Sequence, residues 1–506
     1  MEVKSVCIVG GGSSGWMMAI ALNNNLPEIK VTLVESPNIP IIGVGESTIP
    51  YTARFFKNSL GFKDKDWMSY CDASYKAAIR FRDFSSKGKN FYHPFWTPEE
   101  STYNGFDWAI KRRLTTNPLL FKPDAEDYYN SHYIAYHMSK SNKFDKLSDE
   151  GFSYAHHMDS GKFAEFCQSK FKGKHILANV KHVKLDGSNI VSVTTDKGKI
   201  KADMFIDCTG FKALLIEQSL HEPFDSISDT LLNDTAITCR IPYKDRRAEL
   251  EPFTDCTALS SGWAWNIPIW SRISTGYVFS SKFQTKESAT KEFKKYLANR
   301  FGTVRSKKAE FNTIKFKTGK YRRGWVGNCL ALTLASGFIE PLESTGLALA
   351  CFQIEDFIEK MKGYEYSTFK RNLYNTSLDK AFKEIHNFVL LHYVNSMRED
   401  SGYWRYIKEE IPIPTSLTDY VQSTTKTSVW FPNKSRECIL IGLNIPSAYS
   451  DNNLSWNDKP LTEYTKKEHI TIRKDLEDIE ERKTYYQFKT ERMSGLEDYL
   501  KQEIYK

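Results

Sequence analysis

Residues 6–22 read VCIVGGGSSGWMMAIAL, and they determine the architecture that we expect for the chain. An apolar run is followed at once by a glycine-rich turn and then by an apolar helical pattern. Gly10 allows the tight turn, Gly12 lets the backbone approach a pyrophosphate, and Gly15 lets the helix pack closely against the strand. The sequence therefore predicts a dinucleotide-binding β-α-β unit at the start of the chain.

An acidic residue supports this interpretation. Glu35 ends the next apolar run, residues 29–34, at the distance where an acid meets a ribose hydroxyl. Ser13 and Ser14 begin the helix, and the free N–H groups of a helix start face an anion. We expect these three residues to contact the cofactor.

Composition indicates a globular protein of ordinary type. The chain has 506 residues, 41% hydrophobic and 26% charged, which predicts two or more sub-domains. Aromatic residues are plentiful, so some are expected to line a flat apolar pocket. A net charge of +8 over this length favours a solvated lysine-rich surface over nucleic-acid binding.

Cysteine usage and the N-terminus indicate a cytoplasmic protein. The nine cysteines show no CxxC and no zinc-like spacing, which favours reduced thiols. A buried strand is predicted to begin within six residues of the N-terminus, leaving no room for a signal peptide. No apolar run is long enough to span a membrane, and the adjacent His156 and His157 have no second ligand pair for a metal.

Three further regions carry glycines near the expected cofactor. The loop over residues 39–50 brackets two glycines with prolines, so it is either a strap over a ligand or a plain connector. Hairpin turns at Asp186-Gly187 and 196–198 predict a β-meander that leads into the D-x-T-G stretch at 207–210, a feature of FAD-binding folds of the glutathione-reductase type. A third glycine-marked strand end is expected at Gly327.

The remaining pattern predicts an antiparallel sheet and a helical end. Residues 225–320 have the pattern of antiparallel strands, and residues 353–410 and about 460–506 are predicted to be helical. Pro341 and Gly346 lie just ahead of an apolar helix from about Leu347, which suits a turn that aims helix N–H groups at a ligand.

Five motifs together resemble the flavin-dependent halogenases of the tryptophan halogenase family. They are GGGSSGWM at 10–17, IPIIGVGESTIP at 39–50, SYKAAIRF at 74–81, GWAWNIP at 262–268 and GFIEPLESTG at 337–346. The two-tryptophan motif is the most specific of them, and order and spacing agree from residue 1 to about 350.

The resemblance implies an α/β architecture. The expected fold is an FAD-binding, glutathione-reductase or monooxygenase-like Rossmann-type fold with an added antiparallel sheet. Residues 1–350 would form the FAD module, with inserted sheet and pocket segments at about 75–170 and 225–320. Residues 351–506 would form a mainly helical part that completes the substrate pocket.

The resemblance also implies a reaction. FADH2 from a separate flavin reductase, O2 and a halide would give hypohalous acid, which travels through a tunnel to Lys76. There an ammonium would donate hydrogen bonds to the hypohalite oxygen, or a neutral amine would form a haloamine, which requires a lowered pKa. Glu343 matches the family's second catalytic group, a carboxylate that stabilises the cationic intermediate and accepts its proton.

The other matched positions are assigned by the same resemblance. Thr345 and Gly346 match the halide site; the substrate pocket is matched by His93, Phe95, Trp263, Trp265 and Ser344; and the cofactor site adds Gly43, Gly45, Glu46, Ser47, Gly327 and Leu342. Trp263 and Trp265 would keep the substrate away from the flavin, and a planar ring would stack on Phe95.

The substrate is left broad. The family's clamp for free tryptophan has no recognisable counterpart in residues 420–442, which favours an open pocket for indoles, phenols and other electron-rich rings, with chloride, bromide or iodide. Three alternatives stay open: a tryptophan-specific halogenase, an FAD-dependent aromatic monooxygenase, and a non-enzymatic FAD-carrying binding protein. A homo-oligomer is also left open.

Overall fold

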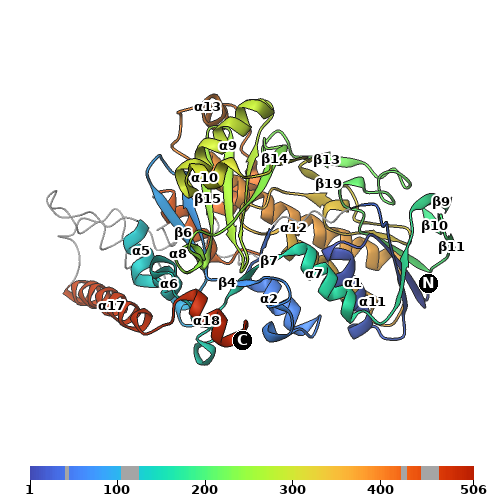
Figure 1. Ribbon diagram of the computed structural model, residues 1–506, viewed down its shortest axis with the longest axis horizontal. Coiled ribbons are helices and arrows are strands. Elements are labelled where there is room, and N and C mark those ends of the chain that lie inside the picture. The colour runs from blue at the N-terminus through green and yellow to red at the C-terminus, as the bar shows by residue number, and fades with distance from the viewer. Residues whose placement is uncertain (40–44, 104–124, 423–429, 446–465) are drawn as a thin grey trace.

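Strand β1 lies in the middle of a six-stranded sheet, at the place expected for a dinucleotide-binding unit (Figure 1). The computed structural model describes residues 1–39, 45–103, 125–422, 430–445 and 466–506. The strand order is β20-β21-β12-β1-β2-β8, and every described neighbour pair except β20–β21 is parallel. The bounds are β1 (Ser5–Val9), β2 (Lys30–Glu35), β8 (Lys174–Leu177), β12 (Met204–Asp207), β20 (Trp325–Val326) and β21 (Cys329–Ala331).

Helices and the predicted meander complete this half of the molecule. Strand β1 is almost continuously apolar because helices pack on one face of the sheet and the meander on the other. The helices are α1 (Ser13–Asn25), α2 (Pro50–Asn58), α3 (Asp64–Trp67), α7 (Ser160–Lys170) and α11 (Gly346–Met361). The antiparallel meander is β9 (Val180–Asp186), β10 (Asn189–Thr195) and β11 (Gly198–Ile200), with the predicted turn at Gly187.

A second sheet of seven strands confirms the antiparallel sheet expected in residues 225–320. Its order is β18-β14-β17-β16-β15-β5-β6. The strands are β5 (Ala78–Arg82), β6 (Asn90–Pro94), β14 (Thr235–Ile241), β15 (Phe253–Leu259), β16 (Gly262–Pro268), β17 (Ile273–Phe279) and β18 (Asn312–Lys315). Helices α8 (Arg246–Glu249), α9 (Lys286–Phe301) and α10 (Thr303–Lys307) lie beside it (Figure 1), and a small sheet of β13 (Phe224–Ser226), β19 (Gly319–Tyr321) and β22 (Gly337–Phe338) adjoins both halves.

A three-stranded sheet brings the N-terminal motifs together. Strand β7 (Ala155–Asp159) pairs on one side with β3 (Gly45–Ser47) and on the other with β4 (Ser74–Lys76). In this register, His157 lies opposite both Ser47 and Ser74. The strap-like loop and the lysine segment, about thirty positions apart in the chain, therefore lie next to the same buried strand.

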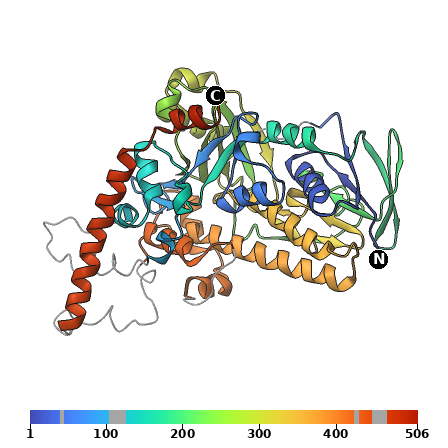
Figure 2. The same cartoon turned by 90° about the horizontal axis from the view of Figure 1, so that it is seen from below.

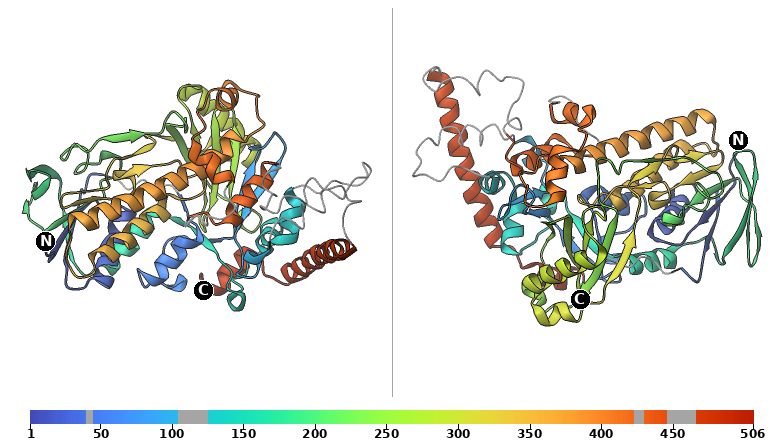
Figure 3. Two further views of the ribbon diagram at one scale, coloured as in Figure 1. Left: turned by 180° about the vertical axis from the view of Figure 1, so that it is seen from behind. Right: turned by 90° about the horizontal axis from the view of Figure 1, so that it is seen from above.

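The C-terminal part is helical, as predicted. Helix α12 (Thr368–Val394) runs beside α11 toward the seven-stranded sheet (Figure 3). Helix α17 (Lys466–Glu491) packs on α5 and α6 and extends from one side of the molecule (Figure 2). The other helices are α5 (Ala125–His132), α6 (Ile134–Ser141), α13 (Gly402–Glu409), α14 (Thr415–Gln422), α15 (Asn433–Gly442) and α18 (Leu496–Glu503), and no helix in the described ranges is long and apolar enough to cross a membrane.

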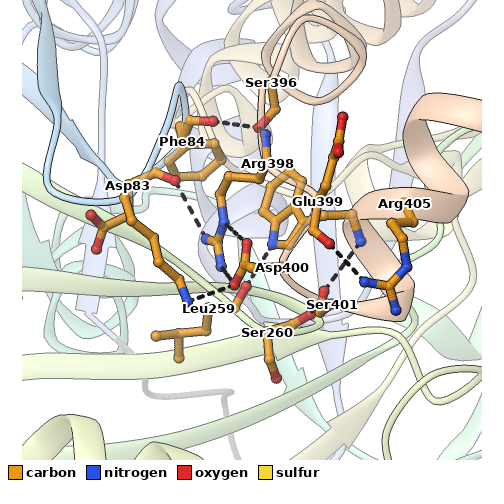
Figure 4. Close-up of polar contacts among 12 residues, drawn as sticks. Asp83, Phe84, Leu259, Ser260, Ser396, Arg398, Glu399, Asp400, Ser401 and Arg405 are labelled. Atoms are coloured by element: carbon orange, nitrogen blue, oxygen red, sulfur yellow. Dashed lines mark hydrogen bonds and ion pairs between the residues drawn. The ribbon is translucent and has the colours of Figure 1, made fainter.

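The segment between α12 and α13 is fixed to the seven-stranded sheet by polar contacts (Figure 4). The Ser396 hydroxyl donates to the Phe84 carbonyl at 2.6 Å, and the Ser401 hydroxyl donates to the Ser260 carbonyl at 2.6 Å. Arg398 forms a two-pronged ion pair with Asp400, at 2.8 and 2.9 Å. These contacts hold the C-terminal end of α12 against two sheet turns.

Candidate active site

A cavity of about 550 Å³ opens between the six-stranded sheet and the seven-stranded sheet. It is bounded by the carboxyl ends of β1, β2 and β12, where ligands bind in open α/β sheets. Most of the predicted cofactor, halide and tryptophan positions line it, namely Gly10, Gly12, Ser13, Ser14, Glu35, Gly45, Glu46, Ser47, Trp263, Trp265, Ser344, Thr345 and Gly346. Its volume is within the range of ligand pockets.

The glycine turn has the geometry that a pyrophosphate requires. Gly10 has a φ of +116°, and a Cβ there would lie 2.1 Å from the Cys208 carbonyl oxygen. At Gly15 a Cβ would lie 2.0 Å from the Gly10 carbonyl, so this glycine packs α1 against the turn instead of lining the cavity. Gly12 has open space beside it, and no side chain in the described part of the chain caps the start of α1. The residues present therefore fit the phosphates of a dinucleotide.

Glu35 lies over this turn and has a partner that sequence reasoning missed. Its carboxylate lies against Gly11 and 2.8 Å from His175 Nε2 on β8. Burial raises the pKa of Glu35, and the nearby His175 opposes that shift. His175 gave no sequence signal, because only the pairing of β2 with β8 brings it next to the acid.

Two other predicted cofactor positions, Gly327 and Leu342, do not line the cavity. Gly327 is in the hairpin between β20 and β21, where a Cβ would lie 1.9 Å from the Ser188 carbonyl, so its φ of +55° serves the packing of the meander. Leu342 is buried but does not line the cavity. Gly43 lies outside the described residues.

Lys76 is fully buried, and its ammonium has three hydrogen-bond acceptors. Nζ donates to Ser47 Oγ, to the Thr48 carbonyl and to Ser344 Oγ, each at 2.9 Å. Burial lowers the pKa of Lys76 to about 7, although the charge of Glu343 opposes this shift. Both the ammonium and the free amine are therefore populated near neutral pH.

Lys76 is joined to the cavity through two hydroxyls. Ser47 and Ser344 both line the cavity, and both accept a hydrogen bond from Lys76. Ser344 has a φ of +59°, which costs a non-glycine residue free energy and is found mainly at functional sites. The cavity thus reaches the first contacts of this lysine.

Glu343 lies between two histidines. Oε2 accepts from His93 Nδ1 at 2.8 Å, and Oε1 is 2.8 Å from His392 Nε2. Burial alone would raise the pKa of Glu343, but the two histidines lower it to about 2. His392 Nδ1 faces the Phe388 carbonyl oxygen at 2.8 Å, and because this oxygen only accepts, Nδ1 donates to it.

The predicted aromatic positions surround these charged groups. The ring of Phe95 is 5.5 Å from Lys76 Nζ, and His93 Nε2 contacts the Ser435 hydroxyl at 2.9 Å. Phe388 and Phe431 stack nearby, with ring centroids 3.7 Å apart. Sequence reasoning missed Ser435 and Phe388 because they come from helical segments without a recognisable motif.

The two tryptophans of β16 form part of the cavity wall. Their ring centroids are 5.9 Å apart, and both side chains line the cavity. Trp263 Nε1 donates to the buried Glu340 carboxylate at 2.6 Å. Tyr393 also donates to this carboxylate, at 2.8 Å. Consecutive residues of α12, His392 and Tyr393, therefore hold the two carboxylates of one turn.

The start of α11 offers free N–H groups to the cavity. Thr345, Gly346 and Leu347 line the cavity. No described side chain caps this helix, and its first turn carries no acid. A small anion such as a halide suits such a helix start.

Comparisons with known proteins point to one family. The family model described as tryptophan halogenase matches residues 5–456. Tryptophan 6-halogenase SttH of Streptomyces toxytricini is 33% identical over 443 residues, which are 82% of this chain and 83% of that protein.

Solved structures are similar over the full chain. The apo structure of VirX1 has a TM-score of 0.87 and 31% identity, covering 100% of each chain. Xcc4156, a flavin-dependent halogenase from Xanthomonas campestris, has a TM-score of 0.85 and 25% identity, covering 100% of this chain and 99% of that one. The predicted α/β, FAD-binding fold class is confirmed by these matches.

Proposed function

The chain belongs to the tryptophan halogenase family and is a flavin-dependent halogenase; from this premise we propose that hypohalous acid formed at the cavity is used at Lys76 to halogenate electron-rich aromatic rings. The observation that carries the proposal is the contact of buried Lys76 with Ser47 and Ser344, two hydroxyls that line the cavity. This short path joins a cofactor-sized cavity to a reactive amine.

The cavity residues would hold FAD along its length. The glycine turn and the start of α1 would bind the pyrophosphate, and Glu35 the ribose. When bound in reduced form, FAD supplies the electrons that convert O2 and halide to hypohalous acid. The free N–H groups at Thr345 and Gly346 would hold the halide at the same cavity.

Lys76 and Glu343 would carry out the step on the substrate. With a pKa of about 7, Lys76 is able to bind the halogen from hypohalous acid. Glu343, held ionised by His93 and His392, would stabilise the positive charge that develops on the ring and accept the departing proton. Phe95 would supply a flat surface for the ring.

Trp263 and Trp265 would separate the two reactions. They lie in the cavity wall, and Glu340 fixes the indole of Trp263. An aromatic substrate held beyond this wall is kept from the flavin, which favours halogenation over direct hydroxylation.

Two substrate classes are candidates. The broad assignment rests on the absence of a recognisable tryptophan clamp in the sequence of residues 420–442. Free tryptophan is the second candidate, because the name of the relative SttH specifies that substrate. A separate flavin reductase is proposed as the partner, since the sequence has a single glycine-rich dinucleotide motif.

The test is an assay with FAD, a flavin reductase, NADH, O2 and one halide at a time, on a panel of tryptophan, simple indoles and phenols. We expect a mass increase that corresponds to replacement of hydrogen by halogen, and loss of this product in Lys76→Met. Hydroxylated product without halogenated product would refute the proposal. Strong preference for free tryptophan would replace the broad substrate class by the second candidate.

A further inference from the structure

A chain of buried hydrogen bonds leads away from Lys76 through Ser47. Ser47 Oγ is 2.7 Å from Thr254 Oγ1 on β15, and Thr254 Oγ1 is 2.9 Å from His157 Nε2 on β7. All three side chains are buried, with exposed fractions of 6%, 3% and 0% for Ser47, Thr254 and His157. Thr254 also lines the cavity, but the function proposed above gives neither Thr254 nor His157 a part in the chemical step.

The contacts of His157 determine which group donates in each hydrogen bond of this chain. His157 Nδ1 lies 3.1 Å from the Pro268 carbonyl oxygen, which only accepts, so Nδ1 carries a proton. Burial, with the nearby charge of Lys76, lowers the pKa of His157 well below its usual range, so the ring is neutral and Nε2 is an acceptor. The Thr254 hydroxyl must therefore donate to His157.

The same reasoning assigns the donors and acceptors at the Lys76 end of the chain. Because Thr254 donates to His157, its oxygen accepts from the Ser47 hydroxyl. Ser47 Oγ in turn accepts from Lys76 Nζ, at 2.9 Å, and from Ser344, at 3.0 Å. Four groups thus form one directed path, from the Lys76 ammonium, which donates, to the His157 Nε2 lone pair, which accepts from Thr254.

Both ends face other titratable groups. Glu343, Glu46 and Cys256, from three different elements, face Lys76. His156 and Lys76 face His157. Burial is the main cause that keeps His157 neutral, and the Lys76 charge adds to it, so transfer of the proton from Lys76 removes the charge repulsion while the effect of burial stays.

We propose that Ser47, Thr254 and His157 form a proton relay that takes a proton from Lys76 Nζ when the halogen binds there and returns it when the halogen leaves. This inference rests on the proposed function of Lys76. His157 and Thr254 act through Lys76, so they are positioning residues and not catalytic residues.

The steps balance. The Lys76 ammonium passes one proton along the relay and leaves a neutral amine and a His157 imidazolium. The amine takes the halogen from hypohalous acid, the O–halogen bond breaks, and the hydroxide leaves as water with a second proton from nitrogen. The ring then takes the halogen, the bonding pair stays on nitrogen, and the relay returns the His157 proton to it. Glu343 takes the proton from the ring and passes it on to restore the ammonium.

A matched pair of variants tests the relay. Thr254→Ser keeps the hydroxyl, whereas Thr254→Val removes it and keeps the shape of the side chain. We measure the single-turnover halogenation rate of both from pH 6 to pH 8 and take their ratio, which cancels the effects of pH on earlier steps. Titration of FAD fluorescence confirms that both variants bind the cofactor equally.

The relay predicts a specific pH dependence of this ratio. In Thr254→Val only the Lys76 molecules that are already neutral react, and these are about one in ten at pH 6 because the pKa is about 7. The valine-to-serine ratio should therefore be about 0.1 or lower at pH 6 and rise several-fold by pH 8. A ratio that stays constant across this range overturns the relay, since a purely structural loss has no such dependence.

A second measurement is independent of turnover. Nitrogen-15 NMR of labelled histidine in the wild-type protein should show His157 neutral and protonated at Nδ1 at pH 7, with His157→Gln used to assign the signal. A proton on Nε2 overturns the relay whatever the activity. If the wild-type protein halogenates nothing, the proposed function fails, and that outcome is separate from a constant ratio in an active enzyme.

Discussion

Replacing Glu343 by glutamine tests the two-histidine arrangement directly. The pKa of Glu343 falls from an ordinary 4.5 to about 2, and one pKa unit corresponds to about 1.4 kcal/mol. The surroundings therefore favour the ionised carboxylate by about 3 kcal/mol. An amide has no charge, so it loses the attraction between the carboxylate and the two histidines, and its NH2 group takes the place of one acceptor oxygen.

We expect Glu343→Gln to lower the free energy of unfolding by about 3 kcal/mol at pH 7. A carboxyl with a lowered pKa stabilises the fold fully above its unfolded pKa, and this contribution disappears as the pH falls from about 4.5 to about 2. The difference between wild type and variant should therefore shrink over that window. Halogenation should fall by about 10²–10⁴-fold, the usual contribution of a general base.

Denaturant unfolding at pH 7 and pH 3, together with the halogenation assay, measures both effects. Glu355→Gln is the control, because Glu355 is a partly buried carboxylate bonded to Tyr51 and Ser59, outside the proposed site. The reasoning is refuted if Glu343→Gln keeps full stability at pH 7, or if its stability loss is equally large at pH 3.

Three other variants are expected to separate cofactor binding from catalysis. Lys76→Met should abolish halogenation but retain FAD. It should also stabilise the fold, because the wild-type protein buries a cation whose pKa is lowered from 10.5 to about 7. This gain should be largest below pH 7 and disappear toward pH 10.5, as measured by unfolding at pH 6 and pH 9. Glu35→Gln should weaken FAD binding about 10-fold in a fluorescence titration, since a charged hydrogen-bond acceptor becomes neutral. Gly10→Ala should prevent FAD binding or folding, since its Cβ would lie 2.1 Å from the Cys208 carbonyl; normal binding measured by the same titration would contradict the turn geometry.

Structural features that depend on local sequence pattern are predicted well from the sequence. The glycine turn, the meander and the antiparallel sheet all follow from short-range spacing, and the structure contains each of them. Gly327 shows the limit of that approach. A glycine after a strand has the same local signal in a cofactor turn and in a hairpin, and only the packing of Ser188 against it distinguishes the two.

The partners of the predicted site residues could not be predicted from the sequence. Lys76 and Glu343 stand in recognisable motifs, but His392, Thr254 and His175 come from a long helix and two strands without any motif. Their positions depend on strand register and on where α12 ends, which are properties of the whole fold. The sequence excludes His157 as a metal ligand and indicates no other role for it, because its hydrogen-bonded neighbours are distant in sequence.

Two contacts between α12 and the turn before α11 limit where the C-terminal part of this enzyme can be exchanged. His392 and Tyr393 are adjacent in the chain, and each binds one of the two carboxylates, Glu343 and Glu340, that flank Pro341 and Leu342. A chimaera that takes its C-terminal half from another protein, in order to change the substrate range, would lose both the His392 and the Tyr393 contact. Such exchanges should therefore begin after residue 401, beyond the Ser396 and Ser401 hydrogen bonds that hold the end of this helix to the sheet.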